Sequence, residues 1–203
     1  MILCRADYDR YQSEDARALG VQPSISRTIL RNLGLKYEIW DYQIRLRRTE
    51  YLANCGKPLP LVLLAKYRLR RAGIRLGFSI PPNTFGPGLS IAHRGDIIVN
   101  GAARVGSNCR IHAGVNIGTA AGQRDAAPII GDNCCIGPGA KLFGPIRLGD
   151  APAIGANAVV NRSFTEGYCT IGGIPARKIS AKSAEALLVK GTTSGARYGE
   201  REG

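Results

Sequence analysis

The sequence contains 203 residues, of which 44% are hydrophobic, and it carries a formal net charge of +13 at pH 7. This length suits one domain plus an appendage, and the apolar share can fill a packed core without disulfides or a metal. The longest apolar stretch, Leu59 to Ala65, is far below the roughly 20 residues of a membrane-spanning helix. No apolar core of a signal peptide occurs near residue 1, so we expect a protein of the reducing cytoplasm.

Residues 1–77 are predicted to form an α-helical N-terminal region. After a polar opening segment, short helices are expected over 24–32, 36 to about 53, and 61–71. Pro58 and Pro60 precede the last of these helices. Apolar positions are spaced loosely in this region, so the sequence predicts that helices are present but not where each one begins and ends.

Most of the positive charge lies in the same region, where 15 basic and 7 acidic side chains leave a net charge of +8. The densest basic cluster consists of Lys66, Arg68, Arg70, Arg71 and Arg75. Two interpretations stay open: a solvated helix face, or contact with a polyanion, either a phosphorylated cofactor or an anionic membrane surface. Nucleic acid is not indicated, because no recognised nucleic-acid-binding module accompanies the charge.

From about residue 80 to residue 175 an aliphatic side chain recurs every six residues, and the next residue is often glycine. A period of six fits neither an α-helix, at about 3.6 residues per turn, nor an amphipathic strand, at about 2. It fits a solenoid of triangular coils, with one inward aliphatic from each side. A β-sandwich with frequent glycine turns is the weaker alternative. The aliphatic positions are Val99, Val105, Ile111 and Ile117, then Ile130, Ile136, Leu142, Leu148, Ile154 and Val160.

One segment interrupts the repeat, and we call residues 118–128, Gly-Thr-Ala-Ala-Gly-Gln-Arg-Asp-Ala-Ala-Pro, the break loop. A solenoid expels such a small, polar insertion, which then either lines a binding site or decorates the surface. After the solenoid, residues 181–190 could form one short helix, and the segment from Gly191 is expected to be disordered.

Six cysteines form no C-x-x-C pair, and several of them fall inside the repeat. There we expect free thiols that pack as small hydrophobic side chains. Their positions are Cys4, Cys55, Cys109, Cys134, Cys135 and Cys169.

Both histidines of the chain lie in the repeat region. His93 stands six residues before Val99, at a position that the repeat otherwise gives to a core aliphatic. His112 follows Ile111, so its side chain should point outward, and a structural role is the simpler interpretation for it. Because imidazole titrates near neutral pH, His93 is the candidate general base.

Several segments of residues 78–180 resemble a known family, the hexapeptide-repeat acyltransferases with a left-handed parallel β-helix. The resemblance is strongest to serine O-acetyltransferases and to the serine-acetyltransferase-like proteins of capsule and exopolysaccharide synthesis. It implies a mainly β fold: an α-helical region at 1–77, the β-helix at 78–180, and a short helix and tail at 181–203. The segments are 80–93 (Ile-Pro-Pro-Asn-Thr-Phe-Gly-Pro-Gly-Leu-Ser-Ile-Ala-His), 97–100, 110–118, 136–141, 154–160 and 172–178.

The resemblance implies direct acetyl transfer from acetyl-CoA to a hydroxyl, with His93 as the base that removes the hydroxyl proton. Backbone N–H groups near Gly118 and Thr119 would stabilise the oxyanion. Pro138 and Ala156 match positions that contact the pantetheine arm in the family. Arg177 and Lys178 could meet the phosphates of CoA.

Three parts of the family's serine site differ in this chain. Where the family has an acidic residue that orients the imidazole, this chain has Ser79, and the aspartate before the histidine is replaced by Ala92. The break loop ends in Asp125-Ala126-Ala127-Pro128 instead of Arg-His-Pro. A carbonyl or hydroxyl could orient the base instead. Candidate substitutes in the substrate site are Arg94, Asp96, Arg124 and Asp125.

The acceptor is therefore predicted to be L-serine, with a sugar hydroxyl of a capsule or exopolysaccharide as the alternative. A non-catalytic β-helix scaffold is a second alternative. A zinc enzyme is not expected, because catalytic zinc of the β-helix type needs three imidazoles and the chain has two histidines. The family's trimeric assembly implies a homotrimer, with the N-terminal helices capping it, extending it, or touching a membrane surface.

Overall fold

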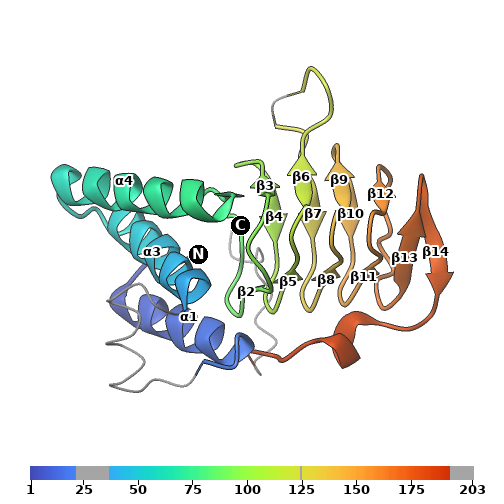
Figure 1. Ribbon diagram of the computed structural model, residues 1–203, viewed down its shortest axis with the longest axis horizontal. Helices are drawn as coiled ribbons and strands as arrows, with labels where there is room; N and C mark the ends of the chain where they lie inside the picture. Colours follow the sequence, from blue (N-terminus) through green and yellow to red (C-terminus); the bar gives the residue numbers. More distant parts are fainter. Residues whose placement is uncertain (22–36, 124, 193–203) are drawn as a thin grey trace.

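The computed structural model describes residues 1–21, 37–123 and 125–192. Three helices precede a long three-sided prism of short strands, and the helices pack at the end of the prism where the chain enters it (Figure 1). The helix expected over 24–32 lies outside the described residues.

The prism has one sheet on each side, and successive coils add one strand to each sheet. All neighbouring strands are parallel except β13 and β14, which form the closing hairpin. Sheet A contains β1 (Phe78–Ser79), β3 (Ile97–Val99), β6 (Asn116–Gly118), β9 (Lys141–Phe143) and β12 (Val159–Val160). Sheet B contains β4 (Arg104–Val105), β7 (Ile129–Ile130) and β10 (Arg147–Leu148). Sheet C contains β2 (Ser90–Ile91), β5 (Arg110–Ile111), β8 (Cys135–Ile136), β11 (Ala153–Ile154), β13 (Thr170–Gly173) and β14 (Ala176–Ser180).

The prism is filled by two inward positions in each six-residue side. The first is the aliphatic of the repeat, and all ten aliphatics predicted to point inward are buried. The second lies two residues earlier and holds Ile or Val in some coils, as at Ile97, Val115 and Ile146, and a smaller side chain in others. Examples are Ala103, Cys109, Cys134, Ala140 and Ala158, all at most 1% exposed. The cysteines of the repeat are thus free and buried, as predicted.

Glycine after the aliphatic is explained by the close approach of consecutive coils. A Cβ on Gly137 would stand 2.6 Å from the carbonyl oxygen of Ile154 in the next coil, well inside contact distance. The Gly137 N–H donates to that same oxygen at 2.8 Å. The ladder hydrogen bond and the tight spacing therefore exclude a side chain here.

The described part of the N-terminal region contains α1 (Arg5–Ala18), α3 (Glu38–Asn54) and α4 (Leu59–Leu76). The polar opening segment forms α1, and α3 matches the helix predicted over 36 to about 53. The last helix is longer than the predicted 61–71 at both ends. Pro60 is tolerated because the first turn of a helix has no internal acceptor for its N–H, and α4 ends at Gly77 with φ 81°. None of the described helices is long and apolar enough to span a bilayer.

A fully buried arginine fastens the helices to the first coil of the prism. Arg47 of α3 donates from Nε to Asp15 of α1 at 2.8 Å and from Nη1 to Glu50 at 3.1 Å. It also donates to the carbonyl oxygens of Phe85 and Gly86, at 2.9 and 2.6 Å. Counting a second bond to Asp15 at 3.3 Å, all five guanidinium N–H groups have an acceptor.

The C-terminal segment runs back along the prism to the N-terminal helices (Figure 1). It contains one short 3₁₀ turn, Ala184–Leu187, within the predicted helix 181–190. Gly191 and Thr192, which we expected in a disordered tail, are buried instead. Their N–H groups donate to Asn108 Oδ1 at 3.0 and 2.9 Å, and Arg17 donates to the Gly191 carbonyl. Two residues of the expected tail are thus fixed between α1 and the first coils.

Candidate active site

His93 lies on the outside of the prism, so the expectation that it takes a core position is wrong. His93 does not follow the six-residue count of the repeat, because the corner between β2 and β3 is two residues longer than the other corners between sheets C and A. Ile91 pairs with Ile111, 20 residues on, whereas Ile136 pairs with Ile154, 18 residues on. Ile91 therefore fills the inward position, and the extra residues carry His93 outward, where it is exposed.

The second histidine stands beside the first. The ring centroids of His93 and His112 are 6.3 Å apart, with 45° between the ring planes. His112 is half-buried, and its Nδ1 lies 2.9 Å from the carbonyl oxygen of Ile136. Because a carbonyl only accepts, Nδ1 carries the hydrogen and Nε2 is left as an acceptor. The outward position of His112 was predicted, but its pairing with His93 was not.

Both histidines belong to one edge of the prism, the C–A edge, where the chain turns from sheet C into sheet A. Later coils stack on the same edge through hydrogen bonds between corners: Gly139 N–H to Ala113 O at 2.9 Å, and Asn157 N–H to Pro138 O at 2.8 Å. Pro138 and Ala156 occupy equivalent corners 18 residues apart and are exposed. The structure therefore aligns His93, Pro138 and Ala156 along one ridge.

At the far end of this edge lies the closing hairpin. Arg177 of β14 is paired in register with Gly172 of β13, which follows the last inward isoleucine of sheet C. Lys178, the next residue, forms an exposed contact with Glu166 at 3.4 Å. From β2 to β14 there are five strand spacings of about 4.8 Å, or about 24 Å along the edge. An extended ligand could thus span from an imidazole to a guanidinium.

Gly118 and Thr119 are not part of this ridge. They lie where β6 ends, at the opposite end of sheet A's strands from His93, because the strand register sets Val99 beside Ile117. From there the break loop projects beyond the prism, as predicted (Figure 1). Within one chain, the proposed base and the proposed oxyanion donors are therefore on different edges.

The remaining candidates are spread over the surface. Ser79 is exposed on β1, and Asp96 is exposed in the corner of His93, where its carbonyl oxygen accepts from Gly114 N–H at 2.7 Å. Arg94 turns to α3 and pairs with Glu38 at 3.2 Å. Asp125 is exposed in the break loop, and Arg124 lies outside the described residues. In the described part of the chain, no carboxylate is hydrogen-bonded to either histidine.

Comparison with known proteins gives one consistent result. The chain is 36% identical over 105 residues to the serine acetyltransferase of Synechococcus elongatus and 34% identical over 114 residues to that of Mycobacterium tuberculosis. In solved structures, it matches the serine acetyltransferase of Brucella abortus with a TM-score of 0.69 at 26% identity, over 89% of this chain and 72% of that one. This chain resembles serine acetyltransferases.

The resemblance has limits that the comparisons define. The matched segments cover 51% and 54% of this chain, but 43% and 49% of the two curated relatives, so the chain matches about half the length of each. No protein-family model matches the chain. The structural match extends over more of this chain than the sequence matches do, and together with the parallel sheets it confirms the predicted left-handed β-helix fold.

Proposed function

We propose that this protein is an acetyl-CoA-dependent O-acetyltransferase that converts L-serine to O-acetylserine. The observation that carries the proposal is the C–A edge: an exposed imidazole at one end, small corner residues along it, and Arg177 at the other. The relatives named serine acetyltransferases favour serine over the sugar hydroxyl that also fits the sequence. Four buried free thiols suit a reducing cytoplasm.

In this reaction His93 removes the proton from the serine hydroxyl as its oxygen attacks the thioester carbon. Backbone N–H groups at Gly118 and Thr119 stabilise the oxyanion of the tetrahedral intermediate. The C–S bond then breaks, and the imidazolium returns its proton to the CoA thiolate. Pro138 and Ala156 contact the pantetheine arm, and Arg177 and Lys178 meet the phosphates. No metal takes part.

The assembly proposed with this mechanism is a homotrimer. Because His93 and Gly118 lie on different edges of one prism, a neighbouring copy is needed to bring a base and an oxyanion site together. Arg94, Asp96, Arg124, Asp125 and Ser79 remain the candidates for holding serine. Arg94 has to leave Glu38 to do so, which an exposed ion pair permits at low cost.

The test is transfer of labelled acetyl from acetyl-CoA to serine by wild-type protein, His93→Asn and His112→Asn. We expect His93→Asn to lower kcat by at least a hundredfold, the usual effect of losing a general base. His112→Asn is the matched control, since an amide nitrogen can keep the bond to the Ile136 carbonyl, and we expect less than a tenfold change.

Each other outcome rejects part of the proposal. Wild-type kcat in His93→Asn removes that residue from the mechanism. Transfer to sugar acceptors but not to serine selects the polysaccharide alternative. If acetyl-CoA neither binds nor raises the unfolding temperature, the protein is a scaffold.

A further inference from the structure

Helix α4 has two apolar faces, and only one of them is covered. Val62, Leu69 and Leu76 are buried against α3 and the first coil. On the opposite side Leu63 is 55% exposed, Tyr67 57% and Ile74 70%. Their spacing of four and seven residues places these three on one stripe of the helix. We call Leu63, Tyr67 and Ile74 the outer stripe.

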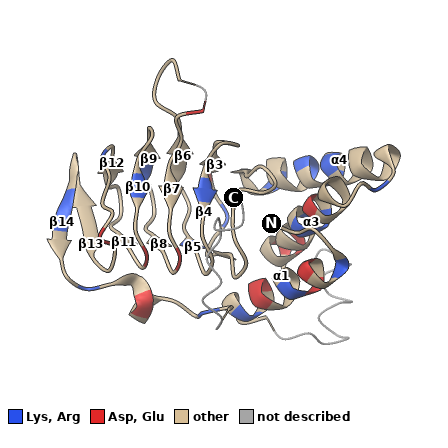
Figure 2. Cartoon of the chain, turned by 180° about the vertical axis from the view of Figure 1, so that it is seen from behind, with Lys and Arg blue, Asp and Glu red and all other residues tan. Residues whose placement is uncertain are grey.

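Basic side chains flank the outer stripe on both sides. Lys66 and Arg70 lie along one flank, and Arg71 and Arg75 along the other, whereas α4 contains no acidic residue. In Figure 2, all the charged segments of α4 are basic. Three further leucines of the first turns, Leu59, Leu61 and Leu64, are also exposed. An exposed apolar stripe with cationic flanks is the pattern of a helix that lies in a lipid–water interface.

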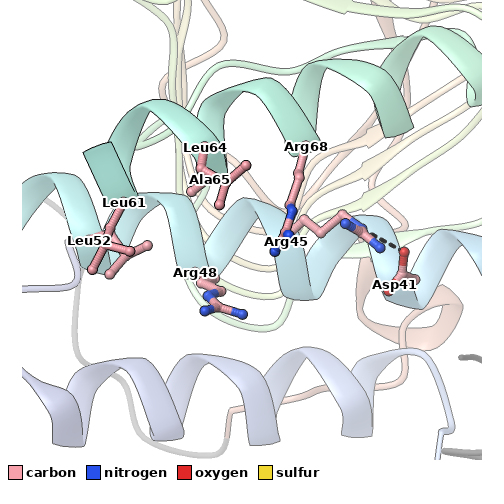
Figure 3. A pocket seen from close by; sticks show the side chains of 8 residues that line it. All are labelled: Asp41, Arg45, Arg48, Leu52, Leu61, Leu64, Ala65 and Arg68. Atoms are coloured by element: carbon pink, nitrogen blue, oxygen red, sulfur yellow. Dashed lines mark hydrogen bonds and ion pairs between the residues drawn. The ribbon is translucent and has the colours of Figure 1, made fainter. Parts of the chain in front are cut away.

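A groove of about 230 Å³ opens between α3 and α4, but on a different side of α4 from the outer stripe: at about 100° per residue, Arg68 and Leu61 lie roughly 120–140° around the helix from it. Arg45 and Arg48 of α3 and Arg68 of α4 line it, and Leu52, Leu61, Leu64 and Ala65 form its apolar part (Figure 3). Asp41 pairs with Arg45 at 2.7 Å. Among the described residues, neither Arg48 nor Arg68 forms an ion pair. Because the groove faces a different side of α4, a flat bilayer in contact with the outer stripe does not reach it, and the cations next to the stripe are Lys66, Arg70, Arg71 and Arg75.

We propose that α4 docks the protein on a bilayer containing anionic phospholipid, with the outer stripe in the hydrocarbon boundary and the flanking cations Lys66, Arg70, Arg71 and Arg75 at the head-group phosphates. The surface is complementary to such a bilayer in both charge and polarity. A second copy of α4 is a poorer partner, because it would face five cations with five more and no acid. Docking here leaves the C–A edge open, since α4 projects away from the prism (Figure 1). This inference goes beyond the proposed acetyl transfer and does not depend on it.

The test is flotation of the full chain with vesicles of phosphatidylcholine alone or mixed with phosphatidylglycerol. We expect at least tenfold tighter binding to the anionic vesicles, weakened by salt. Lys66→Glu with Arg70→Glu, and separately Leu63→Ser with Ile74→Ser, should each reduce binding at least tenfold. The matched controls are Arg147→Glu with Arg162→Glu, and Leu187→Ser with Val189→Ser, which change equal charge and exposed apolar side chains elsewhere.

All the substituted side chains are exposed, so unfolding temperature and vesicle-free acetyl transfer should stay at the wild-type level in every variant. The proposal is overturned if the wild-type protein binds neutral and anionic vesicles equally or not at all. It is also overturned if the charge controls lose as much binding as Lys66→Glu with Arg70→Glu. A fall in oligomer mass caused by Leu63→Ser with Ile74→Ser would assign the stripe to a second copy instead.

Discussion

At the scale of single residues, replacing a glycine that follows a repeat aliphatic tests how closely the coils are stacked. Replacing Gly137 by alanine puts a Cβ 2.6 Å from the Ile154 oxygen, and backbone on both sides has to move. We expect Gly137→Ala to lower the free energy of unfolding by about 1–3 kcal/mol, as overpacking does. Urea unfolding measures it. Gly101→Ala is the control, because its Cβ meets nothing closer than Pro81 at 3.9 Å. Equal losses in the two variants would contradict this explanation of the glycines.

The cysteines give a second prediction at this scale. Cys109, Cys134, Cys135 and Cys169 are buried, and burial raises the pKa of Cys135 to about 11 and that of Cys109 well above its ordinary value. At pH 8 the reactive thiolate of Cys109 and Cys135 is therefore rare, and all four thiols are inaccessible. In Ellman titration we expect exposed Cys4 to react at once, half-buried Cys55 more slowly, and these four only after denaturation. Fast reaction of a third thiol in the folded protein would disagree with the packing described.

The two histidines show what a residue pattern can and cannot predict. Counting by sixes singled out His93, but counting alone placed it in the core. The spacing from Ile91 to Val99 is eight residues, and only the pairing of Ile91 with Ile111 reveals that the corner holds two extra residues. The position of His112 beside His93 depends on the same corner. Sequence periodicity thus predicted the candidate base, and the three-dimensional register determined where it points.

At the scale of elements, the junction between helices and prism depends on one ion cluster. Asp15 of α1 accepts from Arg47 and from the backbone N–H of Leu89 at 2.8 Å, and Glu50 accepts from Arg47 and from Asn83 N–H at 2.8 Å. Two helices, α1 and α3, and the first coil therefore share one buried set of charges. Sequence composition gave no sign of it, because Arg47 looks like any other basic residue of a charged helix.

Removing the centre of this cluster should be costly. Arg47→Met leaves the Asp15 and Glu50 carboxylates buried without a cation, and we expect a loss of about 3–5 kcal/mol in the free energy of unfolding. Arg5→Ala is the control, because its ion pair with Asp9 is exposed and worth at most about 1 kcal/mol. Equilibrium denaturation followed by circular dichroism measures both. A loss below that of Arg5→Ala would mean that the cluster does not hold the helices in place.

Prediction of the elements succeeded where the pattern is repetitive and failed where contacts are long-range. All ten aliphatics that the six-residue period marked are buried in the prism, because each coil repeats the same local environment, but Ile91 at the longer corner was missed. The burial of Gly191 and Thr192 was missed, since it depends on Asn108, more than 80 residues earlier in the chain. A glycine- and serine-rich composition cannot reveal a partner at that distance.

At the scale of the whole molecule, the proposed base and oxyanion site lie on different edges of the prism. His93 precedes sheet A on the C–A edge, and Gly118 ends a strand of the same sheet at its other edge. A prism cannot bring its own edges together without losing the core between them. Catalysis by these residues therefore requires two chains, with one contributing the imidazole and the next the backbone N–H groups.

Complementation between two inactive variants tests this arrangement. His93→Ala removes the base, and Gly118→Val is designed to block the oxyanion site; a Cβ at this position has only Asn116 Oδ1 within 4 Å, at 3.2 Å, and that flexible side chain has to shift. Equal amounts of the two variants are denatured together and refolded into trimers. Each site then combines residue 93 of one randomly chosen chain with residue 118 of another. We expect about a quarter of the wild-type activity in the mixture, and none in either variant refolded alone. A mixture as inactive as its components would place both halves of the site on one chain and exclude the shared site.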